Sequence, residues 1–339
     1  MVKHCMNNTK KTRIILIVSI IVLAILFLVA LMVGRYRINA DTFFKAIFDT
    51  SGQYLTENNV IRILRLPRTI IAILVGMSLS VSGLIYQELF QNKLVSPDLL
   101  GVSNGAGVGA ALAIILGFSG VLLSAFAFVF GITTVVLTVC ISKNFKSKSS
   151  MILLLSGIVV GGFMSSILSM LRYFAQDEAI ISNITFWLMG SFAYTNMSDV
   201  FVLLPIVGIM MAILLIIKWR INIIALGQEE AKTLGLNYNL YRVIIIAMAT
   251  LLTASSVAIA GTISWIGLVV PHIVRLVVGR DTKNTIPITI VFGGIFMLIC
   301  DILSRTFTSS EIPISALTGL IGTPVFIFIL LRKRRTLET

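Results

Sequence analysis

Long apolar runs that contain no charged residue restrict this chain more than any other feature of its sequence. Residues 14–33 form one such run, and residues 99–142 form another that is too long for a single bilayer crossing. A helix needs roughly 20 apolar residues to cross the ~30 Å hydrocarbon core of a membrane. Every backbone polar group in lipid must be paired within the protein, so runs of this kind have to be helical. The sequence therefore predicts an all-α, polytopic membrane protein.

Apolar length predicts about ten transmembrane helices in a single transmembrane domain, residues 1–339, with a helical core at 14–331. A break at Gly117 and Gly120 divides the longest run into two spans, and Gly261 divides the run 243–274 in the same way. A shorter apolar segment, 180–192, contains Trp187 and favours an interfacial or re-entrant helix. The expected spans are 14–33, 66–89, 97–117, 120–141, 151–171, 200–217, 241–261, 263–279, 286–303 and 312–331.

The distribution of basic residues predicts that both termini are cytoplasmic. An even number of spans places both ends on one side. Most of the 27 Lys and Arg residues fall in internal segments when the N-terminus is inside. The net charge of +13 then reflects helix ends and not one basic soluble face, so no nucleic-acid partner is expected. The basic N-terminus resembles that of a signal peptide, but the apolar run after it is long enough to span, which favours an uncleaved first helix.

The composition contains no arrangement typical of an enzyme or of a metal site. The chain has two histidines and three scattered cysteines, with no ligand spacing among them. The glycines of residues 101–109 (GVSNGAGVG) are not followed by the Lys-Ser/Thr of a phosphate-binding loop. Three of them recur every four residues and so share a helix face, which is typical of close helix packing. An intramembrane enzyme is disfavoured for the same lack of catalytic groups.

Four motifs together carry a resemblance to a known family. They are residues 65–68 (RLPR), residues 101–109, residues 225–235 (ALGQEEAKTLG) and residues 265–275 (WIGLVVPHIVR). Over nearly its whole length the chain resembles the FecCD-type permease subunits of ABC importers for iron–siderophores, haem and cobalamin. The resemblance implies a multi-pass protein of the bacterial plasma membrane that translocates its cargo, an iron(III)–siderophore in the commonest case, without catalysing a reaction.

The resemblance also implies partners. Two permease subunits, identical or paralogous, form one path in the surrounding membrane lipid. Two ATP-binding-cassette ATPases bind ATP and Mg and drive it, and an extracytoplasmic substrate-binding protein feeds it. This chain is expected to hold no cofactor of its own. The cytoplasmic loop 220–241 is expected to form the coupling helix that contacts the ATPase, through Ala225, Leu226, Gly227, Glu229, Glu230, Ala231 and Gly235; a solvated connector is the alternative.

Three further sets of residues take roles from the same resemblance. Basic residues cluster around the first external segment, and the family's matching arginines face outward and pair with glutamates of the binding protein; simple anchoring of a helix start is the alternative. These docking candidates are Arg62, Arg65, Arg68 and Arg305. The cytoplasmic gate is expected at Asn92, Leu94 and Ser150, although Lys93 stands where the family often has proline, and a plain turn is the alternative. Pathway and packing positions are Gly101, Asn104, Gly105, Gly109, Gly161 and Ser165.

Two titratable residues leave an alternative transport mechanism open. His272 could relay protons, bind haem iron, or donate to a backbone carbonyl that Pro271 frees, and the last role is favoured because His272 lies near the inner interface. Asp301 has a natural partner in Arg305, four residues later in the chain. A proton-coupled secondary transporter would need such groups near the midplane, so it is the main rival to ATP-driven import. The sequence does not identify the cargo.

Overall fold

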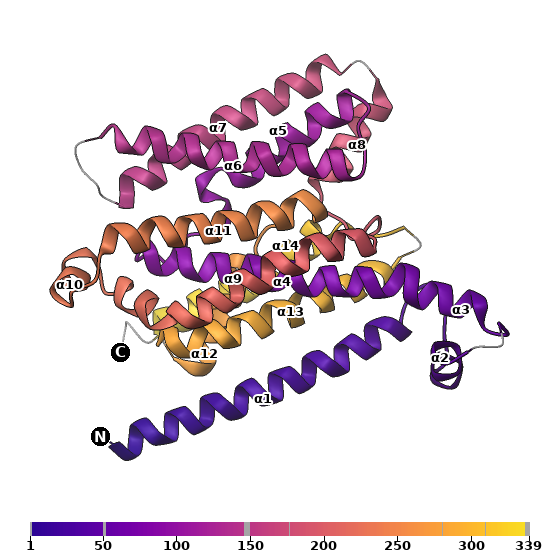
Figure 1. The fold of residues 1–339 in the computed structure, drawn as a ribbon, viewed down its shortest axis with the longest axis horizontal. Helices are drawn as coiled ribbons and strands as arrows, with labels where there is room; N and C mark the ends of the chain where they lie inside the picture. Colours follow the sequence, from indigo (N-terminus) through magenta and orange to yellow (C-terminus); the bar gives the residue numbers. More distant parts are fainter. Residues whose placement is uncertain are drawn as a thin grey trace.

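The computed structural model describes residues 2–49, 52–145, 150–175, 177–279, 281–308 and 310–335. The described part is a bundle of helices lying side by side along one axis (Figure 1). The first residues of α1 and the last residues of α14 lie at the same end of the bundle as α10, which we call the inner end. The opposite, outer end carries α2, α3 and α8.

Each of the ten expected spans coincides with a helix, so the predicted fold class is confirmed. Within the described ranges, seven helices are long and apolar enough to cross a membrane, and three shorter apolar helices complete the set. The ten are α1 (Val2–Met32), α4 (Leu66–Leu89), α5 (Val102–Ile115), α6 (Val121–Lys143), α7 (Ser150–Phe174), α9 (Met197–Ile224), α11 (Tyr238–Ala260), α12 (Ile266–Val278), α13 (Thr282–Thr306) and α14 (Ile314–Arg335).

Shorter elements cap the two ends. The expected short apolar helix appears as α8 (Glu178–Leu188), and the expected coupling helix as α10 (Gln228–Thr233). The structure adds α2 (Ala40–Ile47), α3 (Leu55–Asn59), the π-helical turn η1 (Val60–Arg65) and the 3₁₀ turn η2 (Pro97–Leu100), which the sequence did not suggest. Elements of four to eight residues are too short to leave a clear apolar period. The π turn lies directly before Pro67, which cannot donate to the carbonyl four residues earlier.

Helix α4 forms the centre of the bundle and is buried along most of its length. It packs against α9, α11, α12 and α13. Glycine pairs allow the closest approaches: a Cβ on Gly76 would lie 2.3 Å from the carbonyl oxygen of Gly293, and one on Gly83 would lie 1.9 Å from that of Gly267. Any larger side chain at these four positions would separate the helices, which is the usual function of small residues in membrane bundles.

Helices α5, α6 and α7 form a second group beside this centre (Figure 1). The glycine face of α5 lies against α6, since a Cβ on Gly105 would stand 2.0 Å from the Thr134 hydroxyl and one on Gly109 would stand 2.4 Å from the Phe126 carbonyl. Asn104 donates a hydrogen bond of 3.0 Å to the Gly161 carbonyl of α7. These contacts leave the far side of α7 uncovered in the single chain.

Candidate functional site

The inner-end loop folds into a short helix bounded by two glycines. Gly227 before α10 has φ of +123° and Gly235 after it has φ of +75°, conformations that favour glycine. The Gly235 N–H donates to Lys232 and the Leu236 N–H donates to Ala231, each at 2.9 Å, which is the Schellman termination of a helix. The sequence therefore determines both ends of α10 locally.

Helix α10 exposes charged and apolar side chains together. Glu229 and Glu230 are both exposed, and Glu229 accepts from Lys232 at 3.0 Å. Leu226 and Leu234 are more than half exposed, whereas Ala231 is fully buried beneath the helix. Exposed leucines flanking carboxylates at the tip of a loop are typical of a surface that a partner protein covers.

The turn after α4 contacts this loop and contains two of the gate candidates. Gln91 donates to the Ala225 carbonyl at 3.3 Å, and a Cβ on Gly227 would lie 3.0 Å from the same amide nitrogen. In the turn itself, the Asn92 side chain accepts from the Leu94 N–H at 2.9 Å, and Leu94 is exposed. The structure thus connects Asn92 and Leu94 to the coupling loop through Gln91. The third candidate, Ser150, begins α7 and is half-buried.

A buried polar network that the sequence did not reveal lies just above this turn. Arg275 of α12 pairs with Glu88 at 3.2 Å and donates to the side-chain oxygen of Gln87. The Gln87 amide donates in turn to the carbonyls of Val95 and Gly267, each at 3.2 Å. These bonds join the inner end of α4, the turn 90–96 and α12. Long-range pairs of this kind have no signal in a single sequence.

The same network reaches the carbonyl for which His272 was the expected donor. Gly267 precedes Pro271 by four residues, so its carbonyl is the acceptor that the proline leaves without a helical donor. That carbonyl accepts from the Gln87 amide at 3.2 Å, so Gln87 supplies a donor that the sequence did not suggest. The His272 ring is half-buried and packs edge-on against Phe326, with 5.4 Å between the ring centroids.

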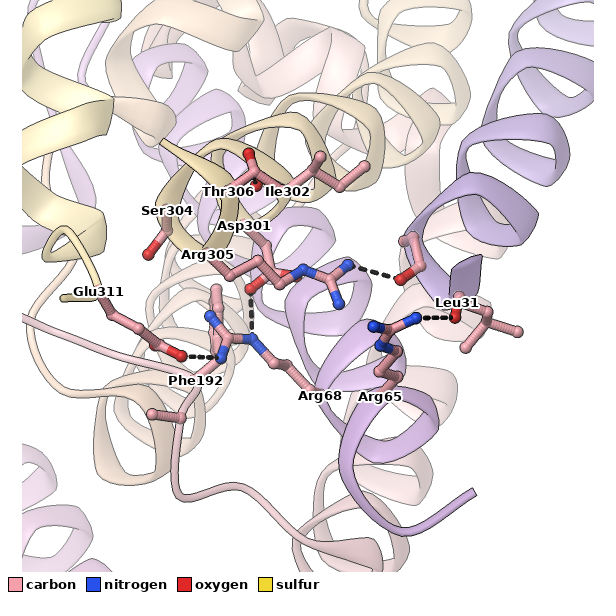
Figure 2. A network of polar contacts seen from close by, with 12 residues as sticks. Leu31, Arg65, Arg68, Phe192, Asp301, Ile302, Ser304, Arg305, Thr306 and Glu311 are labelled. Carbon is pink, nitrogen blue, oxygen red and sulfur yellow. Dashed lines mark hydrogen bonds and ion pairs between the residues drawn. The ribbon is translucent and has the colours of Figure 1, made fainter. Parts of the chain in front are cut away.

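The arginines expected to dock a partner are turned inward at the outer end (Figure 2). Arg68 donates to Asp301 and to Glu311, each at 2.7 Å, and is buried. Arg305 pairs with Asp301 at 3.3 Å, which confirms the predicted contact between these two residues. One fully buried carboxylate therefore serves two guanidinium groups, and Glu311 connects the network to the segment before α14.

Two arginines of this group also bind the end of α1. Arg65 donates to the carbonyls of Leu31 at 2.8 Å and Met32 at 2.7 Å, and Arg305 donates to that of Ala30 at 2.7 Å. The last carbonyls of a helix have no intrahelical donor and carry partial negative charge, so guanidinium groups stabilise them. The expectation that Arg65, Arg68 and Arg305 face outward is not met in the single chain, because internal acceptors bind all three.

Arg62 differs from its three neighbours. It is exposed, and its guanidinium donates to the Ile47 carbonyl at 2.9 Å. Close to it in the chain, Glu57 accepts from the Tyr36 hydroxyl at 2.8 Å, and this hydrogen bond raises the pKa of Tyr36. Of the four docking candidates, Arg62 alone remains available on the outer surface of the described chain.

Helix α7 places the pathway candidates on two different faces. Gly161 is buried against α5, whereas Ser165 is exposed. The hydroxyls of Ser166 and Ser169 donate to carbonyls one turn earlier, each at 3.0 Å, so neither disturbs the apolar surface around it. Within the described range the exposed residues of α7 are uncharged, and the half-buried Arg172 in its last turn donates to the Thr185 hydroxyl of α8 at 3.1 Å. The exposed residues are Met151, Leu155, Ile158, Val159, Gly162, Phe163, Ser165, Ser166, Ser169, Met170, Tyr173 and Phe174.

Among the described residues, no three His, Cys, Asp or Glu side chains come together as metal ligands would. The polar groups form structural networks at the two ends, and the loop with an exposed charged helix lies at the inner end. A polytopic helical bundle with such a loop agrees with the transport subunit that the sequence motifs imply.

Comparison with known proteins supports the same class. Residues 22–332 match the FecCD transport family. The molybdate import system permease protein MolB of Haemophilus influenzae is 35% identical over 93% of this chain and 94% of its own. A probable iron chelatin transport system permease protein of Helicobacter pylori is 32% identical over 91% of this chain and 96% of its own. A solved inward-facing metal-chelate type ABC transporter superposes with a TM-score of 0.86 at 35% identity, covering 94% of this chain and 99% of that one.

The chain therefore belongs to the FecCD transport family. It is a multi-pass membrane protein and the permease subunit of an ABC importer, and it is not itself an ATPase. Family membership decides between ATP-driven import and the proton-coupled rival. The chain therefore belongs to the class of permease subunits that the four sequence motifs implied.

Proposed function

We propose that this permease carries an iron(III)–siderophore complex into the cytoplasm. The exposed residues of α7, none of which is charged in the described range, are the observation that supports this cargo most directly. If α7 lines the path, as the resemblance implies, its exposed residues would offer a bare ion no charge, and the half-buried Arg172 in its last turn is bound to Thr185. A chelate that encloses its metal would pass such a surface without tight binding. The H. pylori relative is named for iron chelatin, which agrees with this proposal.

Molybdate is an alternative cargo for a permease of this fold, because the H. influenzae relative is named for molybdate. Haem and cobalamin are the further alternatives that the resemblance implies. Growth of a deletion strain on single iron sources, with and without the restored gene, separates these cases. Loss of growth on one siderophore, together with loss of radioactive iron uptake from it, supports the proposal. Normal growth on every siderophore and loss of molybdate, haem or cobalamin uptake would reject it.

The proposed complex contains a second permease subunit, two ATPases that bind ATP and Mg, and an extracytoplasmic binding protein. Helix α10 would fit the ATPase, with Glu229, Glu230 and the flanking leucines as the contact. The turn containing Asn92 and Leu94 would respond through Gln91. Docking of the binding protein would involve Arg62, whereas Arg65, Arg68 and Arg305 would act from within the outer network.

A glycine comparison tests the coupling assignment. Replacing Gly227 by alanine places a Cβ at 2.8 Å from the Glu230 carboxylate in a conformation that alanine rarely adopts. We expect this variant to lose most transport and most co-purifying ATPase while the chain remains in the membrane. Gly208 of α9 has open space around it, so Gly208→Ala is the matched control and should behave as wild type.

Charge reversal of α10 provides the second arm of this test. Glu230→Lys changes an exposed residue and should disturb the contact without disturbing the fold. ATPase binding and ATP hydrolysis in reconstituted vesicles are the measurements. Unchanged values for both Gly227→Ala and Glu230→Lys would show that α10 is only a solvated connector.

A further inference from the structure

An apolar groove lies between α1 and α13 in the inner half of the bundle. Its volume is about 350 Å³. Ile14 and Val18 on its α1 side are more than half exposed, so the groove opens to the surroundings of the protein and not to its interior. The lining residues are Ile14, Ile15, Val18, Ser19, Val22, Phe292 and Ile295.

The chemistry of the groove suits a hydrocarbon chain. Six of its seven lining residues are apolar. The hydroxyl of Ser19 donates to the Ile15 carbonyl at 2.6 Å, which satisfies the one polar side chain in the lining. A ligand with polar groups along its length would find no partner for them there. The occupant is therefore expected to be apolar where it touches the groove.

The groove lies within one leaflet of the membrane. Gly294 of α13 lies beside Leu23, and Arg305 bonds the Ala30 carbonyl, so α1 and α13 run in the same direction from the inner end. At 1.5 Å per residue, the stretch 14–22 is about 12 Å long, which fits within half of a ~30 Å hydrocarbon core. Because the groove begins where the charge-free run of α1 begins, directly after Arg13, that half is the inner leaflet.

Two lysines lie at the inner mouth of the groove. Lys11 precedes Ile14 by three residues and Ile15 by four, so it lies on the face of the groove, whereas Lys10, four residues before Ile14, lies at the edge of that face, about 110° from its centre at 100° per residue. Both lysines are exposed, and neither takes part in the ion pairs that the structure gives among its described residues. Arg13 is also exposed, but at 100° per residue it points almost directly away from the groove.

We propose that the α1–α13 groove and the two lysines form an inner-leaflet site for an anionic phospholipid. One acyl chain would lie against Val18 and Phe292, and the headgroup would reach Lys11 and Lys10. Lysines next to the cytoplasmic end of a membrane helix attract anionic lipids, each by about fivefold in affinity. The groove adds a defined position for the chain, which basic residues alone would not provide.

The test uses the complete chain purified into nanodiscs containing equal amounts of phosphatidylglycerol and phosphatidylcholine, with bound lipid counted by native mass spectrometry. Phosphatidylglycerol should be retained preferentially by the wild type. Lys11→Gln should lower that preference about fivefold, and Lys10→Gln with Lys11→Gln should lower it further. Arg13→Gln removes the same charge from the other side of the same helix and should leave the preference within about twofold of wild type, since it does not face the groove.

Substitutions that fill the groove distinguish lipid bound at this site from lipid that surrounds any membrane protein. Ser19→Phe should abolish retention, whereas Ile17→Phe, on an exposed position turned away from the groove, should not. Size-exclusion profiles would check that both variants fold. Equal retention of the two lipids, equal effects of Arg13→Gln and Lys11→Gln, or full retention by Ser19→Phe would each overturn the proposal. Absence of any retained lipid on the wild type would overturn it too, since another protein surface would then cover the groove.

Discussion

The buried arginines at the outer end and the carboxylates of α10 at the inner end use charge in opposite ways. At the outer end, Arg65, Arg68 and Arg305 bind carboxylates and helix carbonyls within the chain. At the inner end, the carboxylates of α10 stay exposed, and Ala231 is the buried residue by which this helix packs against the bundle. Both clusters are candidate contact surfaces in the sequence, yet of the two only the carboxylates of α10 are exposed.

The difference follows from where each cluster lies along a helix. The outer arginines lie within or beside transmembrane helices, where a guanidinium without acceptors is costly and neighbouring helices supply carbonyls. The residues of α10 lie in a loop that water surrounds, so their charges need no partner inside the protein. A cluster of charges is therefore more informative about partners when it lies far from the apolar spans.

The largest effect on stability is expected from a substitution at Asp301, the residue at the centre of the outer network. Asp301→Asn leaves Arg68 and Arg305 buried without their shared carboxylate, and removing one partner of a buried ion pair typically costs about 3–5 kcal/mol of unfolding free energy. Asp41 and Lys45 provide the matched exposed pair, also four residues apart and 2.6 Å between charges. Asp41→Asn should leave the thermal unfolding of the chain nearly unchanged, because solvent screens this exposed pair. Equal shifts of both variants in thermal unfolding of the purified chain would contradict an internal role for Asp301.

An intermediate effect is expected from the inner network. Gln87→Met keeps the side-chain length but leaves the Gly267 carbonyl without the Gln87 donor and removes one acceptor of Arg275, which still pairs with Glu88, at a cost of about 1–3 kcal/mol. His272→Gln should change stability less and keep substantial ATP-driven uptake. The measurements are thermal unfolding and uptake in vesicles at several pH values. A larger loss from His272→Gln than from Gln87→Met would restore a functional role to the histidine.

The smallest effect concerns docking at the outer surface. Arg62→Glu should slow association with the binding protein by up to about fivefold, the size of a surface charge pair, and more so at low salt. Arg68→Glu should instead lower the stability of the permease, because Arg68 is buried between Asp301 and Glu311. Surface plasmon resonance at two salt concentrations distinguishes the two cases. If Arg68→Glu slowed association at unchanged stability, the outer arginines would have to face the partner after all.

The sequence predicted the helices more completely than the contacts between them. All ten spans follow from apolar length, because lipid requires each span to satisfy its own backbone. The pair Asp301–Arg305 was also accessible, since residues four apart in a helix are neighbours. By contrast, Arg68 is far from Asp301 in the sequence, and Gln87 is far from Gly267. A single sequence contains no signal for such pairs.

What the sequence determined by itself is the class of the protein, the number of its spans, the common side of its termini and the boundaries of α10. These features depend on apolar length, the asymmetry of basic residues and local glycine conformations, and each is contained in a short stretch of chain. The tertiary structure alone decided which charges face inward. Burial of Arg65, Arg68 and Arg305 depends on acceptors that α1, α13 and the segment before α14 bring together only when the bundle has formed.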